Sequence, residues 1–203
     1  MKICADFLRK NTFILAIHYP EKANNMELIG TTFSLSSSYF LSVFHNLAKW
    51  GGKHQLVAIN PSKEEEYFLT LVDSQEERDL VVFEGHNLRS DYLEIENGKT
   101  VKEEKIHIFG FPSESVQHIN QYKGTLLEAS IRCIGELSEV QSLGSIIIFN
   151  TVLIGNHSGS PIVNESGKVL GIAKAEIVNV KEYENHSLGI YLAPNDVFIS
   201  KYI

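Results

Sequence analysis

Residues 145–172 decide the fold of this chain and read Ser-Ile-Ile-Ile-Phe-Asn-Thr-Val-Leu-Ile-Gly-Asn-His-Ser-Gly-Ser-Pro-Ile-Val-Asn-Glu-Ser-Gly-Lys-Val-Leu-Gly-Ile. Apolar, β-branched runs lie on both sides of a polar hexapeptide, Asn156–Pro161. Residues of the β-branched type favour strands, and glycine and proline favour the turn between them. The stretch therefore predicts two strands joined by a loop that presents Ser158.

Similar runs recur along the whole chain at short intervals, bounded by Gly, Pro, Asn and Ser. They cover residues 12–18, 27–35, 38–44, 55–59, 66–72, 79–84, 105–111, 122–135, 145–154, 160–164, 168–178 and 187–193. Many are rich in Val, Ile, Phe, Tyr and Thr, which indicates strands, and their repetition predicts an all-β barrel or sandwich. We predict one helical turn over residues 46–50, stopped by Gly51-Gly52, and a second from residue 195 or 196 to about residue 202.

The loop Asn156–Pro161 resembles the nucleophile loop of trypsin-like (chymotrypsin-fold) serine proteases. His45 closes an apolar segment that is similar to the corner carrying the family's catalytic histidine. Asp79 opens the sequence Asp-Leu-Val-Val-Phe, which resembles the family's Asp-Leu-Ala-Val strand. The resemblance implies that Ser158 is a nucleophile, that His45 is its general base, and that Asp79 orients the histidine. The three residues also occur in the family's order.

The resemblance also implies an architecture. We expect an all-β protein with two six-stranded antiparallel β-barrels and a short C-terminal helix. The first barrel, over residues 1–100, would carry the histidine and the aspartate, and the second, over residues 101–203, would carry the serine and the oxyanion loop. The polar stretch 90–104 is the expected linker, and residues 106–112 resemble the strand that begins the family's second barrel. The site is expected at the barrel interface, where clefts commonly lie.

Two features of the sequence resemble the bacterial high-temperature-requirement (HtrA/Deg-like) proteases more than other members of the family. Relatives that are activated from zymogens carry an aspartate directly before the nucleophile, whereas this chain has His157. The HtrA/Deg-like branch has asparagine there and does not mature by trimming. Residues 188–197 also resemble the strand and helix start of that branch. The resemblance runs from about residue 12 to residue 200, and no PDZ-like continuation is expected.

The oxyanion hole is the point where the chain departs from the family. The resemblance implies that the backbone N–H groups of Asn156 and Ser158 bind the developing oxyanion. Relatives usually have glycine at the earlier position, because glycine turns freely. Asparagine tolerates left-handed backbone better than most residues, so the hole either forms directly or rests collapsed until something binds. Gly155 offers a second alignment, with one extra residue in the loop.

The residues expected to line the substrate pocket are Val152, Lys174, Ala175 and Glu176. An apolar residue at Val152 argues against selection of Arg or Lys and favours a medium-sized apolar side chain before the cut bond. Glu176 would change that preference if its carboxylate pointed inward. Lys174 and Glu176 also fit the exposed face of an alternating strand, which is the interpretation we favour.

The composition is that of an ordinary globular protein. Hydrophobic residues make up 43% and charged residues 21% of the 203 residues, and the formal net charge is −7. The acidic residues are spread along the chain, and no basic surface for nucleic acid is expected. No run approaches the ~20 apolar residues of a membrane-spanning helix, and the N-terminus does not fit a signal peptide. Cys4 and Cys133 give no disulfide framework, so we expect a cytoplasmic protein.

Other chemistries fail on spacing. The eight histidines and two cysteines form no His-x-x-x-His or Cys-x-x-Cys pattern, so no metal site is expected. Asn156 and Ser160 occupy both glycine positions of a Gly-x-Ser-x-Gly hydrolase elbow, which is therefore absent. Triad chemistry needs no cofactor. Three Asn-x-Ser glycosylation patterns are discounted, because one of them, Asn156–Ser158, would lie within the site itself.

The sequence therefore predicts a serine endopeptidase that hydrolyses protein or peptide substrates through an acyl-enzyme. One alternative is a non-catalytic peptide-binding or scaffold module of the same fold, in which Asn156 marks a broken oxyanion hole. A third hypothesis is a latent protease that an activating protein partner switches on by ordering residues 153–158.

Overall fold

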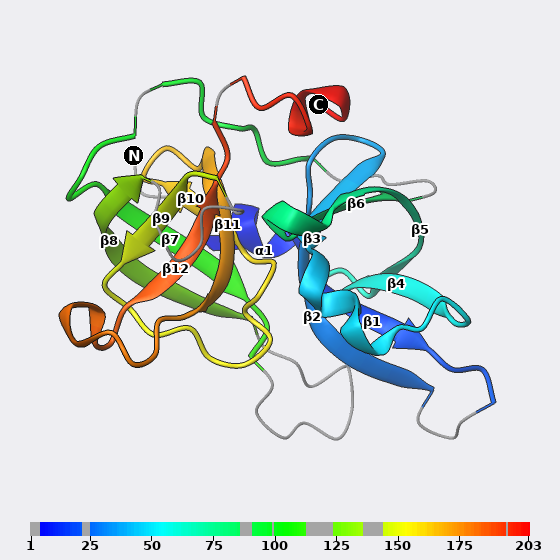
Figure 1. Cartoon of the computed structure of the whole chain (residues 1–203). Helices are drawn as coiled ribbons and strands as arrows, with labels where there is room; N and C mark the ends of the chain where they lie inside the picture. The colour runs from blue at the N-terminus through cyan, green and yellow to red at the C-terminus, as the bar shows by residue number, and fades with distance from the viewer. Residues whose placement is uncertain are drawn as a thin grey trace.

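The computed structural model describes residues 5–21, 25–85, 91–98, 100–112, 124–135, 144–193 and 195–203. Within them the strands form two closed, six-stranded antiparallel barrels that lie side by side (Figure 1). The predicted trypsin-like double barrel is thereby confirmed.

The first barrel is built from strands β1 to β6, in the spatial order β1-β2-β3-β6-β5-β4. Their bounds are Thr12–His18 (β1), Met26–Ser34 (β2), Tyr39–Val43 (β3), Gln55–Asn60 (β4), Glu65–Gln75 (β5) and Leu80–Gly85 (β6). Each strand coincides with a predicted run, because apolar β-branched and aromatic residues alternate or cluster where a strand faces a core.

The second barrel has the order β10-β11-β12-β9-β8-β7. Its strands are Lys105–Gly110 (β7), Thr125–Gly135 (β8), Ile146–Phe149 (β9), Pro161–Asn164 (β10), Val169–Glu176 (β11) and Ser187–Tyr191 (β12). The apolar run of β9 is continuous because both of its faces are covered. Ile147 and Phe149 pack inside the barrel, while Ile146 and Ile148 pack under a smaller outer cluster.

Buried apolar clusters fill each of the two barrels, and another joins them. Phe13, Phe40 and Phe83 pack inside the first barrel. A third cluster lies between the barrels and includes Phe33 from the first and Phe109 from the second. Each fully buried phenylalanine contributes about 1.5–3 kcal/mol, so this shared apolar layer fixes how the barrels sit against each other.

Within the described ranges the helices are few and short. They are α1 (Ala5–Asn11) and the 3-10 helices η1 (Phe44–Lys49), η2 (Glu76–Arg78), η5 (Lys181–Tyr183) and η6 (Ile199–Lys201). The predicted turn after His45 corresponds to η1, and the predicted C-terminal helix is reduced to the single turn η6. Helix α1 was not predicted, since a seven-residue helix that buries only Leu8 and Asn11 shows no apolar period.

The segment between the barrels is anchored along its length. The amide of Leu93 donates to the Ser34 carbonyl at 3.1 Å, and Ile95 forms a parallel bridge with Val169. Both apolar side chains are buried. Residues 91–98, predicted to belong to a linker, therefore pack against both barrels; the beginning of that prediction, Ser90, lies outside the described residues.

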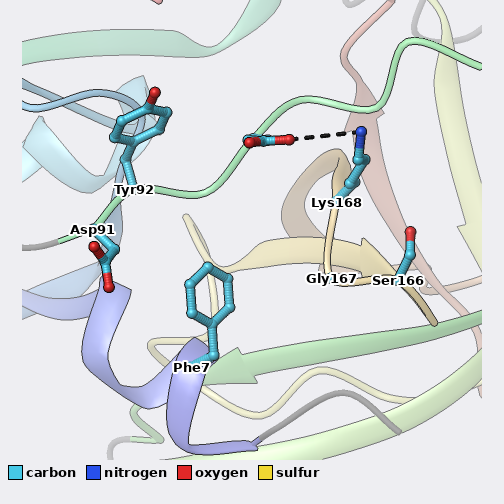
Figure 2. A pocket seen from close by; sticks show the side chains of 7 residues that line it. Phe7, Asp91, Tyr92, Ser166, Gly167 and Lys168 are labelled. Atoms are coloured by element: carbon cyan, nitrogen blue, oxygen red, sulfur yellow. Dashed lines mark ion pairs between the residues drawn. The ribbon is translucent and has the colours of Figure 1, made fainter. Parts of the chain in front are cut away.

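A cavity of about 400 Å³ lies where this segment passes α1 and the β10–β11 turn. Figure 2 shows Phe7 and Tyr92 on one side of it and Lys168 on the other. The Lys168 ammonium is 3.6 Å from the Glu94 carboxylate. This cavity contains none of the residues predicted to be catalytic.

The segment after β12 returns to the first barrel. The Tyr202 hydroxyl donates to the Asp73 carboxylate on β5 at 2.7 Å, and burial together with that carboxylate raises the pKa of Tyr202 to about 12. The Asp196 carboxylate accepts N–H groups at the start of η6 and forms an ion pair with Arg78. Residues of the second half of the chain therefore brace the turn that precedes β6.

The backbones of the two barrels approach each other closely at Gly159. Its φ is +91°, and a Cβ atom there would lie 1.9 Å from the carbonyl oxygen of Thr31. The amide of Thr31 also donates to the carbonyl of Ser158 at 2.9 Å. Only glycine allows this contact, because both the dihedral angle and the space exclude a side chain.

We expect Gly159→Ala to lower the free energy of unfolding by more than about 3 kcal/mol, because the methyl group would force the barrels apart. Gly167→Ala is the matched control: its φ is +84° but no atom lies within 4 Å of the added Cβ. The control should lose only about 1–2 kcal/mol from the left-handed backbone. Urea denaturation measures both, and equal losses in the two variants would contradict the close contact.

Candidate active site

His45 lies on η1, directly after β3, where the chain turns out of the first barrel. Its backbone amide donates to Oδ1 of Asp79 at 2.8 Å, and its Nδ1 lies 2.8 Å from Oδ2. The carboxylate can only accept, so the ring proton sits on Nδ1 and Nε2 is left free to act as a base. The side chain of His45 is 44% exposed, whereas that of Asp79 is 8% exposed.

Asp79 caps η2 in the left-handed conformation, with φ +58°, immediately before β6. Aspartate adopts this region more readily than most residues. Burial on its own raises the pKa of the Asp79 carboxyl, but hydrogen bonds from the His45 ring and from Lys174, with the charge and amide of His45, bring the pKa below its ordinary value. The group is therefore an anion at neutral pH.

Ser158 lies in the loop between β9 and β10. Its carbonyl accepts hydrogen bonds from the Thr31 amide at 2.9 Å and from the Asn46 side chain at 3.0 Å. The hydroxyl donates to the carbonyl of Lys174 at 2.7 Å. The serine backbone is thus held against the first barrel beside η1, while its hydroxyl is turned toward β11 instead of toward His45.

His45 and Ser158 line the same cavity, which has a volume of about 260 Å³. Its other lining residues are Leu28, Ile29, Asn46, Ala48, Lys49 and Asn156. The structure therefore brings together all three residues predicted to be catalytic: Asp79 contacts His45, and His45 shares a cavity with Ser158. Although the cavity at α1 is larger, this one is lined by two of the residues predicted to be catalytic.

The predicted oxyanion residue Asn156 has φ +69°, and its carbonyl accepts the Thr31 hydroxyl at 2.7 Å. Within the part of the chain that the structure describes, neither the N–H of Asn156 nor that of Ser158 has an acceptor. Two backbone donors of this loop, at Asn156 and Ser158, are therefore without an acceptor among the described residues.

Among the residues predicted for the substrate pocket, Lys174 has a different position from the others. It is the extra residue of a β-bulge, since β11 pairs Ala173 with Gly189 and Ala175 with Leu188. The bulge turns its side chain to the Asp79 carboxylate, with which its ammonium forms an ion pair. Strand alternation could not indicate this, because a bulge shifts the register.

Val152, Ala175 and Glu176 do not line the cavity that holds His45 and Ser158. Their role in substrate binding stays a prediction.

His157, directly before Ser158, is fully buried. Its Nδ1 donates to the carbonyl of Ile154 at 3.0 Å, and its ring packs where a side chain on Gly110 would stand. Burial lowers the pKa of His157, an effect that the hydrogen bond to Ile154 opposes only in part. A neutral imidazole therefore supports the nucleophile loop at the position where zymogen-activated relatives carry an aspartate.

The described residues contain no group of three or more His, Cys, Asp or Glu side chains that could hold a metal ion. Among those same residues, no helix has both the length and the apolar character needed to cross a membrane.

The depressed pKa of His157 predicts acid destabilisation. Below the ordinary value of 6.5 the unfolded histidine takes up a proton that the folded one does not, so stability falls as the pH drops through this window. We expect His157→Gln to flatten the fall of the melting temperature between about pH 7 and pH 5. His186→Gln, at an exposed turn, is the control and should leave the slope unchanged. An unaltered slope in His157→Gln would refute this role.

The family model of Peptidase S7, flavivirus NS3 serine protease, matches residues 72–191. No curated protein matches the chain. Among solved structures, the active form of the Rv3671c protease of M. tuberculosis superposes with a TM-score of 0.73 at 15% identity, covering 96% of this chain and 82% of that chain. The inactive form of the same protease superposes with a TM-score of 0.68 at 13% identity, covering 96% of this chain and 90% of that chain.

The HtrA-type protease AlgW with a tripeptide gives a TM-score of 0.73 at 16% identity, covering 95% of this chain and 60% of that one. The likeness to the solved structures shows the fold, and the family match covers more than half of the chain.

Proposed function

Since the chain belongs to the Peptidase S7 family of flavivirus NS3-type serine proteases and is a serine endopeptidase, we propose that Ser158, His45 and Asp79 are its catalytic residues. The observation that carries the assignment is the pair of hydrogen bonds between His45 and Asp79, both at 2.8 Å, beside a cavity that Ser158 also lines.

In the proposed reaction, the Ser158 oxygen attacks the peptide carbonyl carbon while Nε2 of His45 takes its proton. The proton then passes to the amine nitrogen as the C–N bond breaks, leaving an acyl-enzyme. Water, deprotonated by the same nitrogen, hydrolyses the ester and restores the serine. Asp79 keeps the ring in the required tautomer and stabilises the imidazolium. This chemistry draws on no cofactor.

The free N–H groups of Asn156 and Ser158 support a role as the oxyanion hole. Donors of this kind stabilise the charge on the tetrahedral intermediate, and losing one costs about 10²–10³ in turnover. The substrate is proposed to be a protein or peptide with a medium-sized apolar residue before the cut bond, on the basis of Val152. A cytoplasmic location is proposed from the scarcity of cysteines, and Cys133 is a free thiol.

A fluorophosphonate probe tests the assignment. It should label Ser158, and Ser158→Ala should abolish labelling, because the probe needs an activated hydroxyl. His45→Gln should slow labelling by at least about 10³-fold. Ser166→Ala, in the turn between β10 and β11, is the matched control and should label normally. Intact-mass spectrometry and peptide mapping give the readout. An unlabelled wild-type chain under all conditions would favour the non-catalytic module.

We further propose that the chain rests in a latent state. The supporting observation is that the Ser158 hydroxyl is engaged by the Lys174 carbonyl while the Asn156 carbonyl is engaged by the Thr31 hydroxyl. Before attack the serine must rotate toward His45, and an activating partner would act by rearranging residues 153–158.

Thr31→Val distinguishes the resting loop from a competent one. If the Thr31 hydroxyl holds the resting loop, its removal should speed probe labelling roughly five- to tenfold, the equivalent of one hydrogen bond. The control is Thr32→Val, whose hydroxyl bonds the Leu41 carbonyl inside the first barrel. Slower labelling in Thr31→Val, with normal labelling in the control, would mean that the loop is already competent.

A further inference from the structure

The carboxylate of Asp79 accepts hydrogen bonds from two side chains, His45 and Lys174. Its Oδ1 accepts a hydrogen bond from the His45 backbone amide. Its Oδ2 accepts hydrogen bonds from both Nδ1 of His45 and the Lys174 ammonium. The lysine comes from the second barrel and the other two groups come from the first. The Lys174 side chain is 22% exposed and that of Asp79 is 8% exposed, so the contact is largely shielded from water.

The β-bulge makes this arrangement a built feature of the fold. Lys174 is the inserted residue between the paired positions Ala173 and Ala175. Bulges occur beside active sites because they turn a side chain away from its expected face. The same residue contacts Ser158 through its carbonyl, so one position on β11 touches the nucleophile with its backbone and the carboxylate with its side chain.

We propose that Lys174 is a positioning residue that shares the Asp79 carboxylate with His45 and thereby sets the pH range in which His45 is a neutral base. This inference rests on the proposed catalytic roles of His45, Asp79 and Ser158. Nδ1 of His45 and Nζ of Lys174 both contact one oxygen atom, so a protonated His45 would stand beside a second cation. When two like charges both contact one carboxylate oxygen, each disfavours the charged form of the other group.

Two other cationic side chains on the neighbouring helices are already paired. On η1, Lys49 is paired with Glu27 of β2 at 3.2 Å, and Arg78 of η2 is paired with Asp196. Glu176, at the end of β11, is exposed. The groups that act directly on Asp79 are His45 and Lys174. Removing the charge of Lys174 should therefore change the protonation equilibrium of the His45 imidazole more than removing any of these other charges.

The test is an NMR titration of the His45 ring in wild-type chain and in Lys174→Met, which keeps the length of the side chain and removes its charge. The His45 signal is assigned by its loss in His45→Gln. In Lys174→Met the titration midpoint should rise by about one pH unit, because the imidazolium would then be the only cation in contact with the Asp79 carboxylate. Lys174→Arg should keep the wild-type midpoint.

Lys168→Met is the matched control, since Lys168 is a lysine of the same barrel that faces Glu94 (Figure 2). It should leave the His45 midpoint unchanged. An unchanged midpoint in a folded Lys174→Met protein would overturn the proposal, as would a shift of the same size in Lys168→Met.

The titration needs no substrate, so it is independent of whether the chain cleaves peptides. Where turnover is measured as well, the acidic limb of kcat/KM should move with the NMR midpoint while KM stays unchanged. If the midpoint moves and Ser158 never reacts with a fluorophosphonate, the electrostatic role stands and the proposed catalytic function fails. If Ser158 reacts and the midpoint does not move, the reverse holds.

Discussion

The backbone of Thr31 touches the backbone of Ser158 and Gly159 across the interface between the barrels, and the position of the whole site follows from this contact. One threonine donates its amide to Ser158 and its hydroxyl to Asn156. Its carbonyl fills the space left by the missing side chain of Gly159. Because the first barrel also carries His45 and Asp79, this contact brings the serine to the histidine without a covalent link.

The strands of both barrels could be predicted from the sequence. Each strand faces at least one apolar core and therefore contains a run of apolar residues. The order of the three residues that we propose to be catalytic was also visible in the sequence. The direction of two side chains was not. Lys174 points to Asp79 because a bulge breaks the alternation of β11, and the Ser158 hydroxyl points to the Lys174 carbonyl because of a choice among side-chain rotamers. The pattern of residue types along the sequence shows neither where a strand shifts its register nor which rotamer a side chain adopts.

Burial decides how the nucleophile loop is supported. Relatives activated by cutting carry an anion before the serine, which needs a new cation to pair with it. His157 needs no such cation, because its buried ring is neutral: Nδ1 donates to the Ile154 carbonyl, while Nε2 is buried without a hydrogen-bond partner among the described residues. The loop before Ser158 is thereby held by the burial of His157 and by its hydrogen bond to Ile154.

The ion pair between Arg78 and Asp196 joins residues 118 positions apart. Since a ribosome releases the chain from its amino end, the turn next to Asp79 emerges long before the carboxylate that braces it, and also before the serine. A nascent first barrel therefore contains His45 and Asp79 before Ser158 has been synthesised. Its turn at Arg78 stays without the Asp196 carboxylate until the C-terminal segment is released.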